Sequence, residues 1–145
     1  METSRAETGL SASKISSYTT ALITIQVVRI IGALFLFEYQ KGNLPAVFAI
    51  PAGVGDILVG ITAPIVALSI RKGSPLTLAL ALTWNALGIA DLVYAVTVAS
   101  LGGATYVLTS YLAVIPAVFV PLAIILHVAA IVFLVRGLRR TSRTV

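Results

Sequence analysis

Four long apolar stretches, separated by short polar segments, dominate the sequence of 145 residues. They cover residues 15–37, 45–70, 76–100 and 111–135, and each reaches the ~20 residues that a helix needs to cross the hydrocarbon core of a bilayer. An open sheet would leave backbone groups unpaired in lipid, and the alternating pattern of a membrane barrel strand is absent. The pattern therefore predicts an all-α integral membrane protein with four antiparallel transmembrane helices.

The composition supports a membrane setting. Hydrophobic residues make up 59% of the chain and charged residues 10%, and the mean hydropathy is +1.05. A soluble domain reaches such values only by exposing much apolar surface to water, so the lipid bilayer is the expected solvent and partner. Because the chain has no cysteine, thiolate metal sites, iron–sulfur clusters and thiol nucleophiles are excluded.

Lysine and arginine residues fall unequally on the two sides of the predicted bundle. One side has eight of them: Arg5, Lys14, Arg71, Lys72, Arg136, Arg139, Arg140 and Arg143. The loops of the other side contain Lys41 alone. This bias predicts that both termini are cytoplasmic and that the protein lies in the inner (cytoplasmic) membrane. Because these cations lie between and beyond the apolar stretches, we expect the net charge of +5 to orient the protein in the membrane. We expect no nucleic-acid partner.

The predicted organisation is a single four-helix domain, residues 15–136, between two tails. Residues 1–14 are polar and lack the basic start and cleavage site of a secretory signal, so we expect a disordered cytoplasmic tail. Residues 137–145 form a basic cytoplasmic tail suited to anionic lipid. Pro116 and Pro121 predict a kink or broken turn in the outer half of the fourth helix, which is either an ordinary proline kink or the mark of a ligand path.

Four ionisable residues interrupt the apolar stretches: Arg29, Asp56, Asp91 and His127, one in each. A charged side chain at this depth costs about 2.5 to 3.5 kcal/mol, and such residues usually face a bundle interior, a partner or a water-filled path. At ~1.5 Å per residue, Arg29 and Asp56 both fall near the middle of the bilayer and form the natural ion pair. Asp91 falls toward the outer side, and Asn85 and His127 at or inward of the midplane. The predicted site is therefore a column.

Small residues flank these polar positions at helical spacing. Three sets share a helix face: Gly53, Asp56, Gly60 and Ala63; Trp84, Gly88 and Asp91; and Ala123, His127 and Ala130. Offsets of three and four residues place each set on one face, and small residues there let another helix approach closely. All three faces are therefore predicted to point into the bundle.

The charges of this interior do not balance. Arg29 contributes one positive charge, Asp56 and Asp91 contribute two negative ones, and neutral His127 none, which leaves one negative charge. A proton on Asp91 or His127, or an inorganic or organic cation, would balance it. We therefore expect a site for a proton, a cation or a small polar solute, used in transport or sensing. Its expected ligand-binding residues are Arg29, Asp56, Asn85, Asp91 and His127.

Two alternatives stay open. In a purely structural or assembly protein, Arg29 would snorkel, Asp91 would reach the outer interface and Asp56 would only bridge helices. In a haem- or quinone-linked redox subunit, His127 would be an axial ligand. Because His127 is the one histidine in the chain, ligation by two histidines would need a dimer.

No catalytic motif supports an enzyme. The sequence has no Walker, dinucleotide or zinc-binding pattern, and one histidine with aliphatic neighbours predicts no catalytic triad. The main expectation therefore includes no catalytic residue and no cofactor. Since helix axes pack ~8 to 10 Å apart, four helices leave a narrow interior. A solute path would form more easily between protomers, so we expect a homo-oligomer.

Three short strings carry a resemblance: residues 51–60 (PAGVGDILVG), residues 84–92 (WNALGIADL), and the pairs Val120-Pro121 and Leu126-His127. Together they resemble a family of small, uncharacterised bacterial membrane proteins with four helices, and the resemblance implies no activity. In layout the chain is also loosely similar to the DoxX group, through the arginine before residues 30–32 (IIG) and an acid in the second helix. Asp56 stands where that group usually has glutamate.

Overall fold

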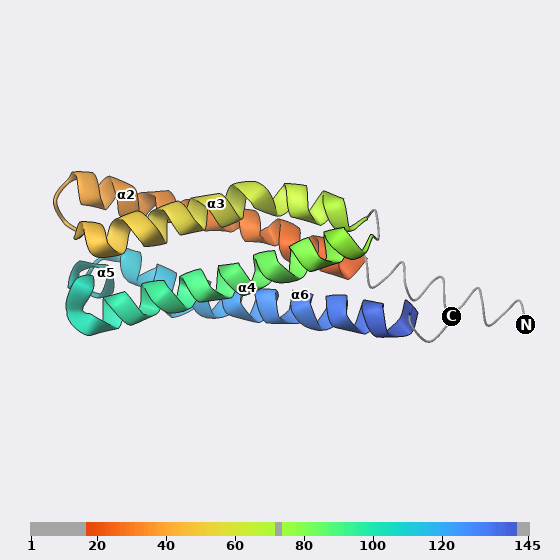
Figure 1. Cartoon of the computed structure of the whole chain (residues 1–145). Coiled ribbons are helices and arrows are strands. Elements are labelled where there is room, and N and C mark those ends of the chain that lie inside the picture. Colours follow the sequence, from red (N-terminus) through yellow and green to blue (C-terminus); the bar gives the residue numbers. More distant parts are fainter. Residues whose placement is uncertain (1–16, 72–73, 142–145) are drawn as a thin grey trace, which may run out of the picture.

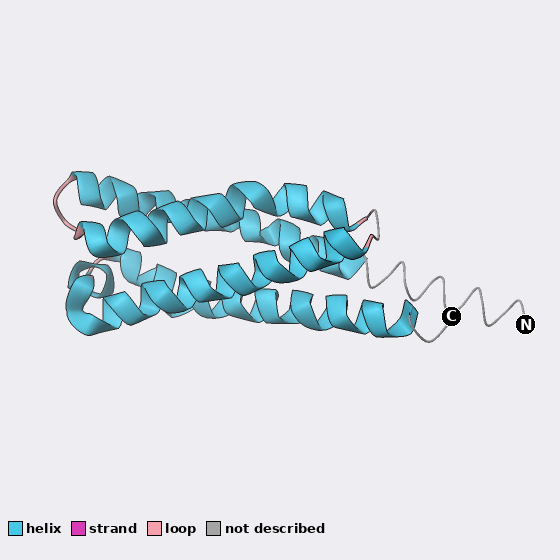
Figure 2. Ribbon diagram, in the orientation of Figure 1, coloured by secondary structure: helices cyan, strands magenta, loops and turns pink. Residues whose placement is uncertain are grey.

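The computed structural model describes residues 17–71 and 74–141, and nearly all of them are helical (Figure 2). The first long helix, Ser17–Gln40, contains a 3₁₀ segment, η1 (Ile25–Gly32), and ends in α2 (Ala33–Gln40). It is followed by α3 (Ala46–Ile70) and α4 (Pro75–Val98). Four short elements then lead into α6 (Val120–Thr141): η2 (Ala99–Gly103), α5 (Thr105–Thr109), η3 (Tyr111–Ala113) and η4 (Ile115–Phe119). The long helices lie lengthwise beside one another (Figure 1).

In the described part of the chain, four helices are long and apolar enough to cross a membrane: Ser17–Gln40, Ala46–Ile70, Pro75–Gly102 and Tyr111–Gly137. They overlap the four predicted stretches, so the all-helical fold with four membrane-length helices is confirmed. The predicted tail at residues 1–14 lies outside the described residues. The first residues of the predicted basic tail, from Gly137 to Thr141, continue α6.

Large apolar side chains point outward along every long helix. Examples are Val28, Leu58, Leu87 and Ile125, all of which are exposed. Soluble monomers rarely expose apolar patches of more than a few hundred Å², whereas lipid solvates such a surface well. The surface and the helix lengths together indicate a multi-pass membrane protein.

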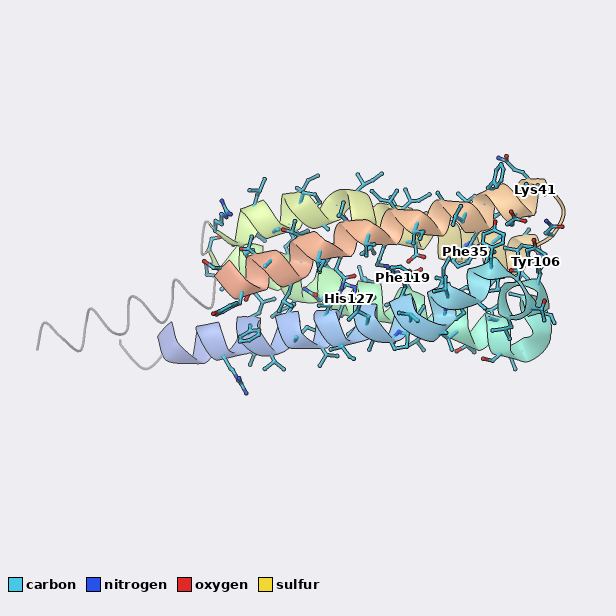
Figure 3. All side chains as sticks on the ribbon, turned by 180° about the vertical axis from the view of Figure 1, so that it is seen from behind. Phe35, Lys41, Tyr106, Phe119 and His127 are labelled. Atoms are coloured by element: carbon cyan, nitrogen blue, oxygen red, sulfur yellow. The ribbon has the colours of Figure 1, made fainter. Side chains whose placement is uncertain are left out.

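Inside the bundle, two apolar clusters lie on either side of a polar layer. One cluster includes Phe35, Phe48, Leu92 and Ala123. The other includes Ile23, Val66, Ala81 and Leu134. Between residues of the two clusters lie Gln26 and Arg29 in the first helix, Asp56 in α3, Asn85 in α4 and His127 in α6. Figure 3 shows His127 in the middle part of the bundle, with Lys41 and Tyr106 at one end.

The 3₁₀ geometry of η1 places its polar residues on one face. Gln26, Arg29 and Gly32 are all buried and follow one another at intervals of three. A 3₁₀ helix has three residues per turn, so this interval repeats on the same face, whereas in an α-helix each step would rotate the side chain by about 60°. The local change of helix type therefore aligns Gln26 and Arg29 closely on the inward face.

Glycines on α3 let the first helix come close. A Cβ atom on Gly60 would lie 2.7 Å from Ile30 Cγ1 and 3.0 Å from the backbone nitrogen of Ile30. At Gly53 it would lie 2.7 Å from Leu36 Cγ. The predicted inward face of α3 is confirmed, because Gly53, Asp56, Gly60 and Ala63 are all buried.

The end of the bundle formed by residues 38–45 and 99–119 is less regular. Around Pro116 the chain forms the π-helical turn η4 instead of a continuous α-helix, in keeping with the predicted break. Glu38 is buried and accepts hydrogen bonds from Lys41 Nζ at 3.0 Å, Asn43 Nδ2 at 2.6 Å and Tyr111 Oη at 2.8 Å. Glu38 thus joins the turn between α2 and α3 to η3 by hydrogen bonds.

Candidate functional site

Arg29 is the centre of the buried polar layer, and only 4% of its side-chain surface is exposed. Its Nε donates to Asp56 Oδ1 at 2.6 Å, and its Nη2 lies 2.6 Å from the same oxygen. Nη2 also donates to Asp91 Oδ2. The predicted ion pair between Arg29 and Asp56 is therefore formed, and Asp91 is a second carboxylate on the same guanidinium.

The remaining guanidinium nitrogen connects Arg29 to two other helices. Nη1 donates to the carbonyl oxygen of Gly88 on α4 at 3.2 Å and lies 3.3 Å from Nε2 of His127 on α6. Arginine has five N–H donors in a fixed fork and no acceptor. All five are directed at groups of the protein, so Arg29 fastens the first helix to α3, α4 and α6 at one level.

His127 has the hydrogen-bond arrangement of a neutral imidazole. Asn85 Nδ2 donates to the carbonyl of Ala81 at 2.7 Å, which turns Asn85 Oδ1 toward His127 Nδ1 at 2.9 Å. Because that oxygen can only accept, Nδ1 carries the proton. Nε2 then presents a lone pair to Arg29, which can only donate. Both Asn85 and His127 are completely buried, and the hydrogen bond between them joins α4 to α6.

Trp84 completes the surroundings of His127. The two rings lie 5.4 Å apart between centroids, tilted by 58°, and Trp84 Nε1 donates to Thr62 Oγ1 on α3 at 2.8 Å. A Cβ atom on Gly88 would lie 2.5 Å from Nε2 and Cε1 of His127. The glycine at this position therefore makes room for the imidazole.

The site is one cluster and not the predicted column. The prediction followed the depth of Cα atoms at a fixed rise per residue, which placed Asp91 outward of His127. The long guanidinium side chain of Arg29 removes that separation, because it contacts Asp91 and His127 together with Asp56. All five predicted site residues thus meet: four share contacts through Arg29, and Asn85 joins through His127.

Gln26 also belongs to this layer, although the sequence pattern did not indicate it. Its side chain is buried, and its Nε2 donates to the carbonyl oxygen of Ala123 at 3.1 Å. A polar residue three positions before Arg29 was the available signal. Positions three apart already lie on one face of an α-helix, and the 3₁₀ turn of η1 aligns them more closely.

The cluster has one more carboxylate than it has cations. Asp56 and Asp91 share Arg29, and they retain 11% and 19% of their side-chain surfaces as exposed area. The lower the local dielectric, the stronger the effect of an unbalanced charge. The contacts therefore bring together the charges whose imbalance the sequence predicts.

The described residues include no group of three or more histidine, cysteine, aspartate and glutamate side chains that could hold a metal ion. Both ring nitrogens of His127 contact side chains of this chain. An axial haem ligand needs a free ring nitrogen, so haem binding would require one of these two contacts to break.

Comparison with known proteins gives a family without an activity. No curated protein and no solved structure matches the chain. Residues 5–135, most of the chain, match the family described as "Domain of unknown function (DUF8737)". This agrees with the uncharacterised family that the sequence resembles, while the likeness to the DoxX group stays a resemblance. The chain therefore belongs to the DUF8737 family of unknown function.

Proposed function

We propose that this membrane protein binds a proton or a small cation at the buried cluster of Arg29, Asp56, Asp91 and His127, for transport or for sensing. The single observation that carries the proposal is that one guanidinium serves two carboxylates, while the imidazole beside it has the hydrogen bonds of a neutral ring. The described residues of this layer therefore carry one negative charge that no second positive charge balances.

Burial makes an unbalanced charge in this layer costly. An isolated ionised carboxylate in an apolar interior is so unfavourable that the group neutralises instead, either by binding a proton or by pairing. Asp56 and Asp91 cannot both obtain a full counter-charge from Arg29. Uptake of one positive charge removes this cost, and its release restores it, so binding and the stability of the interior are coupled.

The proposed topology is the one that the sequence predicts: four antiparallel helices in the inner membrane, with both termini cytoplasmic. The distribution of lysine and arginine supports it. The two ends of the described chain, the C-terminal end of α3 and the N-terminal end of α4 lie at the same end of the bundle (Figure 1), which fits this orientation. A homo-oligomer is part of the proposal, because the side chains of the two apolar clusters fill the bundle.

Flux measurements on vesicles test the proposal. The wild-type protein, Asp56→Asn and Asp91→Asn are reconstituted separately into lipid vesicles that contain a pH-sensitive dye, and a proton gradient is imposed. We expect the wild type to dissipate the gradient faster than empty vesicles. Each variant should fall to the rate of empty vesicles, because the one remaining carboxylate is balanced by Arg29.

The fluorescence of Trp84 separates transport from sensing. It is the one tryptophan of the chain, and its ring lies against His127, so a change of charge at the site alters its emission. A change of emission with pH in the wild type, without flux, supports sensing. The absence of both flux and a change of emission would contradict the proposal and support the purely structural alternative.

A further inference from the structure

Gln26 carries the one buried side-chain nitrogen or oxygen atom in the described residues that has no hydrogen-bond partner. This atom is Oε1, and the residue is only 1% exposed. Leaving a buried acceptor unpaired costs about 1 to 3 kcal/mol, and the large majority of buried side-chain polar atoms in proteins are paired. The position of Gln26 Oε1 therefore points to a hydrogen-bond donor from outside the described chain.

This acceptor lies in the layer of the charged cluster. Gln26 is one 3₁₀ turn from Arg29 on the same buried face of η1. Its amide is held by the carbonyl of Ala123, which is one α-helical turn from His127. Gln26 thus connects the two helices that carry Arg29 and His127.

The carboxylates present further acceptors. Asp56 Oδ1 and Asp91 Oδ2 bind Arg29, whereas Asp56 Oδ2 and Asp91 Oδ1 receive no hydrogen bond from the described residues. These two oxygens lie over glycines. A Cβ atom on Gly32 would lie 2.5 Å from Asp56 Oδ2, and one on Gly55 would overlap Asp91 Oδ1.

Because every N–H group of Arg29 is already directed at the protein, the unused capacity of the cluster consists of acceptors and one negative charge. A group suited to it has one positive charge and only hydrogen-bond donors. An anion is repelled, and a neutral solute leaves the charge unbalanced. A proton on a carboxyl balances the charge but leaves Gln26 Oε1 without a donor.

We propose that the ligand is a small monocation whose polar atoms are all N–H donors, an ammonium ion or a protonated primary amine. Its charged group binds at Asp56 Oδ2 and Asp91 Oδ1, and Gln26 Oε1 accepts a hydrogen bond from it, directly or through one water molecule. Gln26 is then a ligand-binding residue. This inference rests on the proposed function, because it names the cation that the cluster takes up.

A series of cations tests this in the wild-type protein. Methylammonium, tetramethylammonium and potassium are titrated separately into protein in lipid nanodiscs, and the emission of Trp84 is followed. All three carry one positive charge, but only methylammonium has N–H donors. We expect saturable binding of methylammonium, with the other two at least about tenfold weaker, which corresponds to about 1.4 kcal/mol.

Three variants test the residues. Gln26→Met keeps the length of the side chain and removes the acceptor, so methylammonium should bind about tenfold more weakly, as expected for one hydrogen bond to a charged group. Gly55→Ala places a methyl group against Asp91 without changing any charge and should also weaken binding. The matched control is Val54→Ala, beside Gly55 on the same helix, where the side chain is exposed and faces away from the cluster. It should leave the affinity unchanged.

The outcomes separate this inference from the function on which it rests. Equal binding of the three cations, or unchanged affinity in Gln26→Met, overturns the inference. If the wild type takes up protons and shows no response to methylammonium, the inference fails and the proposed function stands. If Asp91→Asn binds methylammonium as tightly as the wild type, the charge imbalance is irrelevant and both fail.

Discussion

Arg29→Gln is expected to destabilise the protein by about 3 to 5 kcal/mol, the loss typical of removing one partner of a buried charge cluster. The glutamine would leave Asp56 and Asp91 inside the bundle with no guanidinium between them. It would also remove the hydrogen bonds to Gly88 and His127. Equilibrium unfolding of the purified protein in detergent micelles, with helix content as the signal, measures the change.

The triple variant Arg29→Gln, Asp56→Asn, Asp91→Asn is the control for Arg29. It has no ionised side chain at these three positions, so it should regain most of the stability that Arg29→Gln loses. If Arg29→Gln were as stable as the wild type, Arg29 would reach the membrane surface and would not hold the cluster together. A triple variant no more stable than the single one would assign the loss to packing and not to charge.

The second large effect is expected from removing both carboxylates while Arg29 remains. The double variant Asp56→Asn, Asp91→Asn leaves a buried guanidinium without an anion, and we expect a loss of about 3 to 5 kcal/mol. Each single variant, by contrast, has one carboxylate and one guanidinium. We expect the free energy of unfolding of each to lie within about 1 kcal/mol of the wild-type value. The stability gained by removing the surplus charge offsets the stability lost with the weakened hydrogen bond.

This strong non-additivity distinguishes a charge-balanced site from a purely structural one. If Asp56 and Asp91 only join helices, each substitution should cost a similar amount, and the double variant should cost about their sum. The same unfolding experiment decides between the two. Equal losses in the two single variants that add in the double variant would argue against shared charge compensation, since contacting groups in one network are expected to couple.

The four membrane helices could be predicted because their physical cause is local. A run of about 20 apolar residues must pair its backbone groups within itself when it lies in lipid. The pairing of Arg29 with Asp56 could also be predicted, because buried charges of opposite sign at one depth compensate each other. Both inferences need only the order of residues along each helix.

The features that the sequence did not reveal depend on geometry between helices. The change to a 3₁₀ helix at Ile25–Gly32 is not visible in an evenly apolar sequence, and it aligns Gln26 with Arg29 on the buried face. The reach of the guanidinium turned a predicted column into one cluster with Asp91 and His127. Gly55 lies against Asp91 through the packing of α3 on α4.

The unbalanced charge of the cluster can be measured through the protonation of its two carboxyl groups at neutral pH. Infrared spectroscopy of the protein, with tetramethylammonium as the cation of the buffer, reports a protonated carboxyl group by its C=O stretching band. We expect this band in the wild type and its loss in Asp56→Asn and in Asp91→Asn alike, because either variant leaves one ionised carboxylate paired with Arg29. A wild-type protein without the band, or a band that persists in one of the two variants, would show that the charges of this layer are balanced in another way.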